Sequence, residues 1–339
     1  MEGITVISPG MLTSVQDKGI FGYQWSGICP AGAMDLFSLR VANILVGNEL
    51  DEAGLEVTIL GPSLSFETDE VIAITGANLS PALDGRLIDN NRAIAVKKGQ
   101  VLSFGARKNG CRAYLAFAGG LDVDPLYGSR STILRVGMGG LDGRALRKGD
   151  HIGFRKPRAT LKNMANRVIS VPDAPTDRVK VRVILGPQDY LFKDSGIEAF
   201  LGDEGYVVTN KANRQGYRLE GKEVELKKIG SIVSDGIAPG AVQIPPNQQP
   251  IILLSERQST GGYAKIANVI TVDLPKIGQC ISGTRIFFET VSLEEAQRAM
   301  KDEREFLIRL NEKIESTISI SFQVILDGKN YDITVTEEI

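Results

Sequence analysis

The sequence predicts a mainly β protein with a few helices, divided into two units. Short runs of β-branched residues recur along the chain, and Gly, Pro, Asn and Asp separate them, as turns separate strands. Glycine is frequent, at 37 of 339 residues, and this length suffices for two domains that each bury a core. The clearest predicted strands are residues 4–7, 71–75, 94–96, 101–104, 181–185, 251–254 and 285–289.

The domain organisation is predicted from where this pattern fades. Residues 1–155 are expected to form the first unit and residues 179–290 the second. Between them, in residues 156–178, apolar periodicity weakens and Pro157, Pro172 and Pro175 interrupt the chain, which favours a linker. Residues 291–339 are expected to form a C-terminal appendage.

Two local elements are predicted inside the first unit. Apolar residues at helical spacing predict a helix over residues 34–46, and Gly47 is the residue that ends it. Residues 97–100 lie between two predicted strands as a hairpin loop would, with Gly99 free to adopt a positive φ.

The C-terminal appendage is predicted to be a helix followed by a β-hairpin. Ser292 and Glu295 form a capping box, and an apolar stripe follows it at Ala296, Ala299, Met300, Phe306, Leu307, Leu310 and Ile314. Residues 318–336 alternate around the turn-forming pair Asp327-Gly328. This hairpin is similar to the opening strands of a biotinyl carrier domain, but no biotin-accepting Met-Lys-Met follows it.

Composition excludes several functions. The net charge of −2 provides no positive field for nucleic acid or anionic lipid. Neither a signal peptide nor about 18 consecutive apolar residues occurs, so we expect a cytoplasmic chain with no membrane partner. Three distant cysteines favour neither a disulfide framework nor a thiolate metal site. A single histidine, His151, rules out a histidine metal cluster, and we expect no metal.

Nucleotide-binding fingerprints are missing too. No segment fits a phosphate-binding P-loop, and the Gly-Gly pairs lack the context of a dinucleotide site. Any nucleotide is therefore bound in another way or by another protein of a complex.

Four polar, glycine-rich segments are candidates for binding a small anion, because arginines, hydroxyls and backbone N–H groups next to glycines can converge on one. Each also has a plain structural interpretation. Asp35 is suited to capping the predicted helix, the second segment to a polar surface loop, and Arg218 to an ion pair with Glu220. The candidates are Gln16, Asp17 and Asp35; Ser129, Arg130, Ser131 and Thr132; Asn213, Arg214, Tyr217 and Arg218; and Gln258, Thr260, Gly261, Gly262 and Tyr263.

In this order the segments resemble the biotin-dependent carboxyltransferase-like family, also known as the allophanate hydrolase subunit 2 type. The family includes the carboxyltransferase half of urea carboxylase and the C subunits of 5-oxoprolinases. The resemblance covers about residues 4 to 290 and adds Gln243 to the candidate site. Ile20, Ala31 and Ser259 depart from the family pattern, which has arginine, serine and threonine there.

The resemblance implies tandem cyclophilin-like β-barrels and a heteromer with the B and A subunits of a 5-oxoprolinase. It implies ring opening of 5-oxo-L-proline to L-glutamate with hydrolysis of ATP, whose binding this chain would share with a partner. Arg130, Arg214 and Tyr263 are then the expected catalytic residues. The two arginines would bind the substrate carboxylate or a phosphoryl group, Ser129 and Thr132 would orient it, and Tyr263 would cover it.

Two other functions are compatible with the resemblance. One is carboxyl transfer from carboxybiotin to urea or a related amide, which requires a biotin carboxylase and a carrier. The other is regulation, in which binding to a partner that inhibits a sensor kinase is the whole activity.

Overall fold

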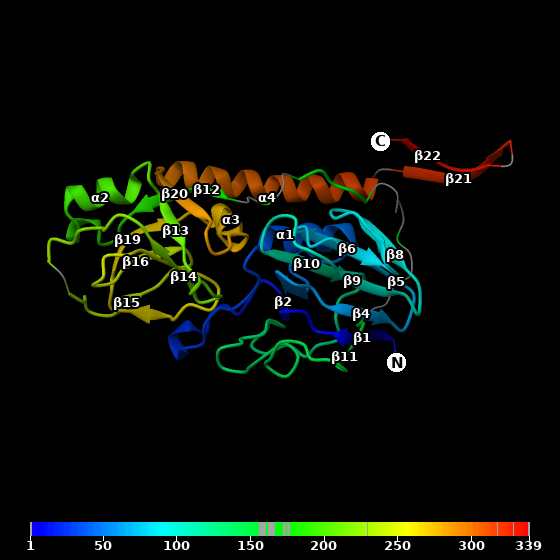
Figure 1. Ribbon diagram of the computed structural model, residues 1–339, viewed down its shortest axis with the longest axis horizontal. Coiled ribbons are helices and arrows are strands. Elements are labelled where there is room, and N and C mark those ends of the chain that lie inside the picture. Colours follow the sequence, from blue (N-terminus) through cyan, green and yellow to red (C-terminus); the bar gives the residue numbers. More distant parts are fainter. Residues whose placement is uncertain are drawn as a thin grey trace.

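The structure is a computed structural model that describes residues 2–155, 161, 167–171, 174, 177–228, 230–316, 318–327 and 329–337. Two β-rich bodies lie side by side, and one long helix runs along both of them (Figure 1). The strands up to β11 form the first unit, and the strands from β12 to β20 form the barrel unit. Among the described residues, no helix combines the length and the hydropathy that crossing a bilayer requires.

The first unit consists of two sheets that enclose one core. Ile4 and Leu64 from one sheet meet Leu55 and Leu115 from the other, and all four side chains are fully buried. One sheet has the order β11 (His151–Gly153), β1 (Gly3–Ser8), β4 (Ser63–Phe66), β9 (Val101–Phe104), β6 (Pro81–Leu83) and β7 (Arg86–Leu87). The other has the order β2 (Leu12–Gln16), β3 (Gly54–Thr58), β10 (Arg112–Phe117), β5 (Glu70–Gly76) and β8 (Ala93–Val96).

The hairpin predicted around residues 97–100 is wrong, although its turn is present. Gly99 has a φ of +88° and the N–H of Gln100 donates to the Lys97 carbonyl, as a tight turn requires. However, β8 pairs with β5, whereas β9 pairs with β4 and β6. The chain passes from one sheet to the other at this turn because each strand finds its partner far away in the sequence.

Helix α1 (Leu36–Leu45) covers one face of the five-stranded sheet, where it contacts β10 and β5. Asp35 caps it as predicted, since its carboxylate accepts a hydrogen bond from the Ser38 N–H at 2.8 Å. Gly47 follows with a φ of +69°, the left-handed conformation that ends many helices.

The barrel unit is a closed barrel, which confirms the mainly β fold; of the two barrels predicted in tandem, this is the one whose strand pairing closes, whereas the first unit consists of the two separate sheets described above. Its core includes Val181, Val242, Ile252, Ile266 and Ile286. The strand order is β12 (Arg178–Leu185), β19 (Ala264–Val269), β16 (Ala241–Ile244), β17 (Ile251–Leu253), β14 (Gly216–Glu220), β13 (Tyr206–Val208) and β20 (Arg285–Thr290). The remaining elements are the helices α2 (Asp194–Leu201) and α3 (Leu274–Gly278) and a small sheet of β15 (Asp235–Gly236) and β18 (Thr260–Gly261).

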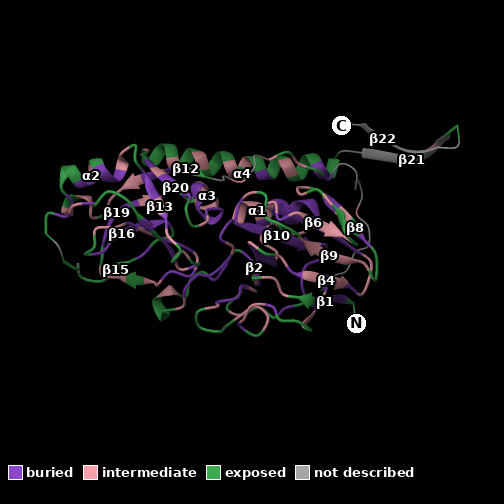
Figure 2. Ribbon diagram, in the orientation of Figure 1, coloured by how far each residue is buried: buried purple, intermediate pink, exposed green. Residues whose placement is uncertain are grey.

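The C-terminal helix and hairpin are both present. α4 (Leu293–Ser316) begins at the predicted capping box, in which the Ser292 N–H donates to Glu295 at 2.8 Å. Only part of its apolar stripe is covered: Leu307 and Ile314 are buried, but Met300 is 53% exposed. Figure 2 shows this contrast between the buried strands and the mostly exposed helix. β21 (Ile318–Leu326) and β22 (Lys329–Glu337) pair as an antiparallel hairpin.

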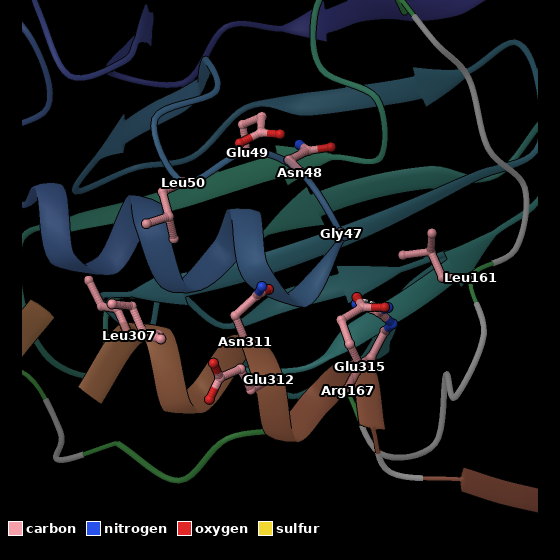
Figure 3. Close-up of a pocket in the computed structure, with 11 residues that line it drawn as sticks. Gly47, Asn48, Glu49, Leu50, Leu161, Arg167, Leu307, Asn311, Glu312 and Glu315 are labelled. Carbon is pink, nitrogen blue, oxygen red and sulfur yellow. Dashed lines mark hydrogen bonds and ion pairs between the residues drawn. The ribbon is translucent and has the colours of Figure 1, made fainter. Parts of the chain in front are cut away.

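Most of the predicted linker, residues 156–178, lies outside the described residues. One described part of it packs firmly on the first unit. Arg167 is buried and donates hydrogen bonds to the Ile44 and Leu45 carbonyls at the end of α1, and it also pairs with Glu315 of α4. Figure 3 shows Arg167 and Glu315 at one side of a pocket of about 580 Å³ between the end of α1 and α4. Arg167 thus ties the end of one helix to the other.

Candidate functional site at the junction of the two units

A cleft of about 580 Å³ lies at the junction of the two units and contains several of the candidate residues. The first unit contributes Met11 and Arg112 to its lining, and the barrel unit contributes Arg214, Tyr217 and Glu256. Arg214 precedes β14 and Glu256 follows β17, so both lie at the ends of neighbouring barrel strands. We call this cavity the inter-unit cleft.

Arg214 is the centre of a buried ion-pair network in the wall of this cleft. Its Nε donates to Glu256 at 2.7 Å, one terminal nitrogen contacts Glu56 on β3, and the other donates to the Gly32 carbonyl at 2.6 Å. Arg112 approaches the same carboxylate oxygen of Glu56 as Arg214, with 3.5 Å between this oxygen and its Nε. Two arginines therefore face two glutamates, and every nitrogen of Arg214 already has a partner.

The network keeps Glu56 ionised although it is buried. Burial alone raises the pKa of a carboxyl group. The guanidinium groups of Arg214 and Arg112 outweigh this effect, together with hydrogen bonds from the Met34 N–H and the Tyr114 hydroxyl, and they lower the pKa of Glu56. The cleft wall thus contains buried charges, but the positive and negative charges balance.

A second set of contacts fixes the two units to each other. The Gln279 side chain of the barrel unit accepts hydrogen bonds from the Cys111 and Arg112 N–H groups, each at 2.9 Å, and donates to Asp35 at 2.7 Å. Arg112 donates to the Tyr217 hydroxyl at 2.7 Å, and burial raises the pKa of Tyr217 to about 12. Two predicted binding residues, Asp35 and Tyr217, therefore lie buried in the contact between the units.

The predicted hydroxyl segment holds an internal carboxylate. Ser129 and Ser131 each donate to the same oxygen of Asp17 at 2.6 Å, and the Arg130 N–H donates to its other oxygen at 2.6 Å. Thr132 donates to the Val15 carbonyl at 3.0 Å. In the same region the amide of Gln16 donates to the Thr132 carbonyl at 3.1 Å. The roles of these side chains as ligands stay predictions, and each has an internal partner here.

The Arg130 side chain is the exception in that segment. Its Nε donates to the Val123 carbonyl at 2.8 Å, and no carboxylate among the described residues forms an ion pair with it. It is partly exposed, so it is available to an anion.

The fourth candidate segment lies at one end of the barrel. Tyr263 is 39% exposed, while Gln243 is buried and donates to the Tyr263 carbonyl at 3.4 Å. Thr260 and Gly261 form β18, and Gln258 accepts a hydrogen bond from Gln215 at 3.0 Å.

The third segment is divided between the two faces of the barrel wall. The Asn213 side chain accepts from the Gln215 N–H at 2.8 Å and shapes the turn before β14. Arg218 is exposed on the outer face of β14, and so is Glu220.

Gly262, the last glycine of the fourth segment, lies next to β18 without joining a strand.

Several residues with no predicted role belong to these clusters. Glu56 and Arg112 are the only charged residues of β3 and β10, two strands that are buried along their whole length, and this is the signal that marks them. Lys265 is buried at the barrel end, where its ammonium group donates to Asp235 at 2.7 Å. Among the described residues, no group of three His, Cys, Asp or Glu side chains is arranged to hold a metal ion.

The comparison with protein families gives a match over most of the chain. Residues 26–290 match the family described as "Carboxyltransferase domain, subdomain A and B". The chain is 38% identical to the 5-oxoprolinase C subunit of Escherichia coli over 91% of its own length and 97% of that protein. It is 33% identical to the 5-oxoprolinase C subunit of Haemophilus influenzae over 92% of this chain and 99% of that one.

Similar solved structures come from larger proteins. The Kluyveromyces lactis urea amidolyase structure matches with a TM-score of 0.84 and 32% identity, over 91% of this chain but 20% of that one. The structure of TTHA0988 matches with a TM-score of 0.76 and 33% identity, over 85% of this chain and 55% of that one. With these matches in sequence and in structure, the chain belongs to the family of carboxyltransferase domains, subdomains A and B.

Proposed function

We propose that this chain is the C subunit of an ATP-dependent 5-oxoprolinase and acts in complex with the sister A and B subunits. The observation that carries this proposal is sequence identity: the chain is 38% identical to a 5-oxoprolinase C subunit that it covers over 97% of that protein's length. Its identity to the urea amidolyase of Lachancea kluyveri is lower, at 34%.

In the proposed reaction, ATP transfers its γ-phosphoryl group to the lactam carbonyl oxygen of 5-oxo-L-proline. Water then adds to the activated carbon, the C–N bond breaks, and the ring nitrogen becomes the amine of glutamate. The carbon is then an acyl phosphate, and a second water molecule hydrolyses it to phosphate and the new carboxylate, so ADP, phosphate and glutamate are the products. Activation is needed because water attacks an unactivated amide slowly.

In this proposal, some residues hold the walls of the site in place and others bind the ligand. Arg214 is held by two glutamates and a carbonyl, so it orients the walls of the inter-unit cleft. Arg130 has no carboxylate partner among the described residues and binds the substrate carboxylate or a phosphoryl group. Tyr263 is exposed at the barrel end, where it covers a bound ligand.

The test is turnover by the complex formed when the chain is produced with its sister subunits. We expect ADP and glutamate to appear together and only with 5-oxoproline present. Arg130→Ala is expected to lower kcat by about 10²–10³, the usual cost of losing one electrostatic donor. Arg298→Ala, on the exposed face of α4, is the matched control and should keep full turnover. An intact complex without 5-oxoproline-dependent ADP release would contradict the proposal.

Carboxyl transfer is the second candidate, favoured by the structural match to urea amidolyase at a TM-score of 0.84. In this case the complex would consume carboxybiotin and urea instead of 5-oxoproline. Incubation with free carboxybiotin and urea, followed by measurement of biotin release, distinguishes the two.

A further inference from the structure

One buried arginine differs from the others in the junction region because no acid neutralises it. Arg257 follows β17 directly after Glu256 and is only 5% exposed. Its Nε donates to the Ile237 carbonyl at 3.0 Å and one terminal nitrogen donates to the Leu254 carbonyl at 3.3 Å. Within the described part of the chain no carboxylate lies within ion-pair distance of it, and its second terminal nitrogen has no protein acceptor there and is not fully buried.

Without a ligand, the burial of this charge lowers the free energy of unfolding. A buried charge normally has a partner of opposite charge, because removal from water is not otherwise compensated. Burial lowers the pKa of Arg257 to about 10, and the only ionisable neighbour that acts on it in the described structure is the thiol of Cys29. Burial likewise raises the pKa of that thiol, so it supplies no negative charge at neutral pH. Arg214, at the end of the neighbouring strand, is neutralised in the usual way, by two glutamates.

A second unsatisfied group lies in the same loop. The Oγ atom of Ser259, two residues from Arg257, is buried and has no hydrogen-bond partner in the described structure. A hydroxyl can donate to an oxyanion, and a guanidinium can bind one in a fork-like geometry. Further along the loop, Gly261 packs closely against the side chains of Ile237 and Gln243, which holds the loop in place.

The cover over this loop is slight. β15 and β18 contribute two residues each, and Asp235, Gly236 and Thr260 are exposed. The strand pairs are Asp235 with Gly261 and Gly236 with Thr260, and the buried Lys265 also anchors the sheet, because its ammonium group donates to Asp235 at 2.7 Å and to the Gly236 carbonyl at 3.0 Å. A sheet of two residue pairs is small enough to open as a unit when these few contacts break.

We propose that Arg257 and Ser259 form an oxyanion-binding site for a carboxylate or phosphoryl group under the β15–β18 flap. The proposal deepens the proposed function, on which it rests for the identity of the ligand: of the carboxylate of 5-oxoproline and a phosphoryl group, the site would receive the one that Arg130 does not bind. The binding of an oxyanion itself can be measured without turnover.

The test is calorimetric titration of the isolated full chain with inorganic phosphate and with 5-oxoproline, at constant ionic strength set with chloride. Pyrrolidone, which is the same lactam without the carboxylate, is the third probe. Arg257→Met is expected to weaken binding of the oxyanion by about tenfold or more. Ser259→Ala, which leaves the charge and the fold in place, is expected to weaken it severalfold. Arg298→Gln matches the loss of charge on an exposed face and should bind like the wild type.

The pattern of binding identifies the ligand. Binding of 5-oxoproline but not of pyrrolidone or phosphate assigns the site to the carboxylate, and binding of phosphate assigns it to a phosphoryl group. If Arg257→Met does not fold, as judged by near-ultraviolet circular dichroism, Ser259→Ala and Arg257→Lys provide the decision.

Two results would overturn the proposal: no oxyanion binding by the wild type at tens of millimolar, or equal binding by the Arg257 and Ser259 variants. Failure of the complex to open 5-oxoproline, with oxyanion binding intact and dependent on Arg257, would refute the proposed function and leave the site standing.

Discussion

Replacement of Glu56 by glutamine is expected to destabilise the protein strongly, because this one carboxylate serves both units. It contacts Arg214, lies 3.5 Å from Arg112, and accepts hydrogen bonds from Met34 and Tyr114 at 2.8 Å. The change leaves two buried guanidinium groups facing one remaining glutamate. Removing one partner of a buried ion pair costs about 3–5 kcal/mol of unfolding free energy.

The assay is urea unfolding followed by fluorescence of the single tryptophan and by circular dichroism, with the midpoint as the measured value. The matched control is Glu67→Gln, whose carboxylate pairs with His151 at 3.0 Å but is 31% exposed, so we expect a loss below about 1 kcal/mol. The double variant Glu56→Gln with Arg214→Met should recover part of the loss, since it removes opposite charges together. A Glu56→Gln protein within about 1 kcal/mol of the wild type would refute this account of the junction.

Acid titration, helix truncation and loss of a buried donor provide three more predictions. Folding lowers the pKa of Glu56, so the stability that this carboxylate contributes is present above the pKa of an unfolded glutamate and is lost as the pH falls through its folded pKa. The Glu56→Gln variant should therefore lose stability less steeply than the wild type in an acid titration. An equal slope would contradict this. Leu307→Ala on α4 should cost about 2–5 kcal/mol, since the side chain is 3% exposed, whereas Met300→Ala should cost little, and melting temperatures check both. Ser129→Ala removes a donor from the buried Asp17 and should cost about 1–3 kcal/mol in urea unfolding, while an unchanged midpoint would show that Ser131 alone satisfies that carboxylate.

The sequence predicted well those features that depend on neighbours along the chain. The cap at Asp35 and the capping box at Ser292 involve hydrogen bonds between residues three positions apart, and both are present. The turn at residues 97–100 is also present, but the pairing of the strands on either side is not local and was predicted wrongly. A turn fixes the direction of the chain over four residues, whereas the choice of strand partner depends on the packing of two whole sheets.

The site was harder to predict for the same reason. From its own segment of the sequence, Arg214 looks like an unpaired cation, yet the two glutamates that pair with it lie 42 and 158 residues away in sequence. Ser129 and Ser131 read as ligands, yet they meet Asp17, which lies 112 and 114 residues earlier in the chain. Only the folded chain shows which polar groups satisfy one another. The resemblance of motifs singled out candidate segments, but it did not show which side chains in them have internal partners.

The difference between the neighbouring residues Glu256 and Arg257 shows how the two tasks are separated. Glu256 faces Arg214 and completes a network whose charges cancel, which suits a permanent contact between two units that must keep one relative orientation. Arg257 faces backbone carbonyls under a thin flap, and its charge is not cancelled. A balanced cluster gains nothing from an anionic ligand, because an added anion would compete with carboxylates that are already in place. An unbalanced arginine would gain its missing partner from the proposed oxyanion, so a rigid junction and a binding site can occupy adjacent positions without interfering.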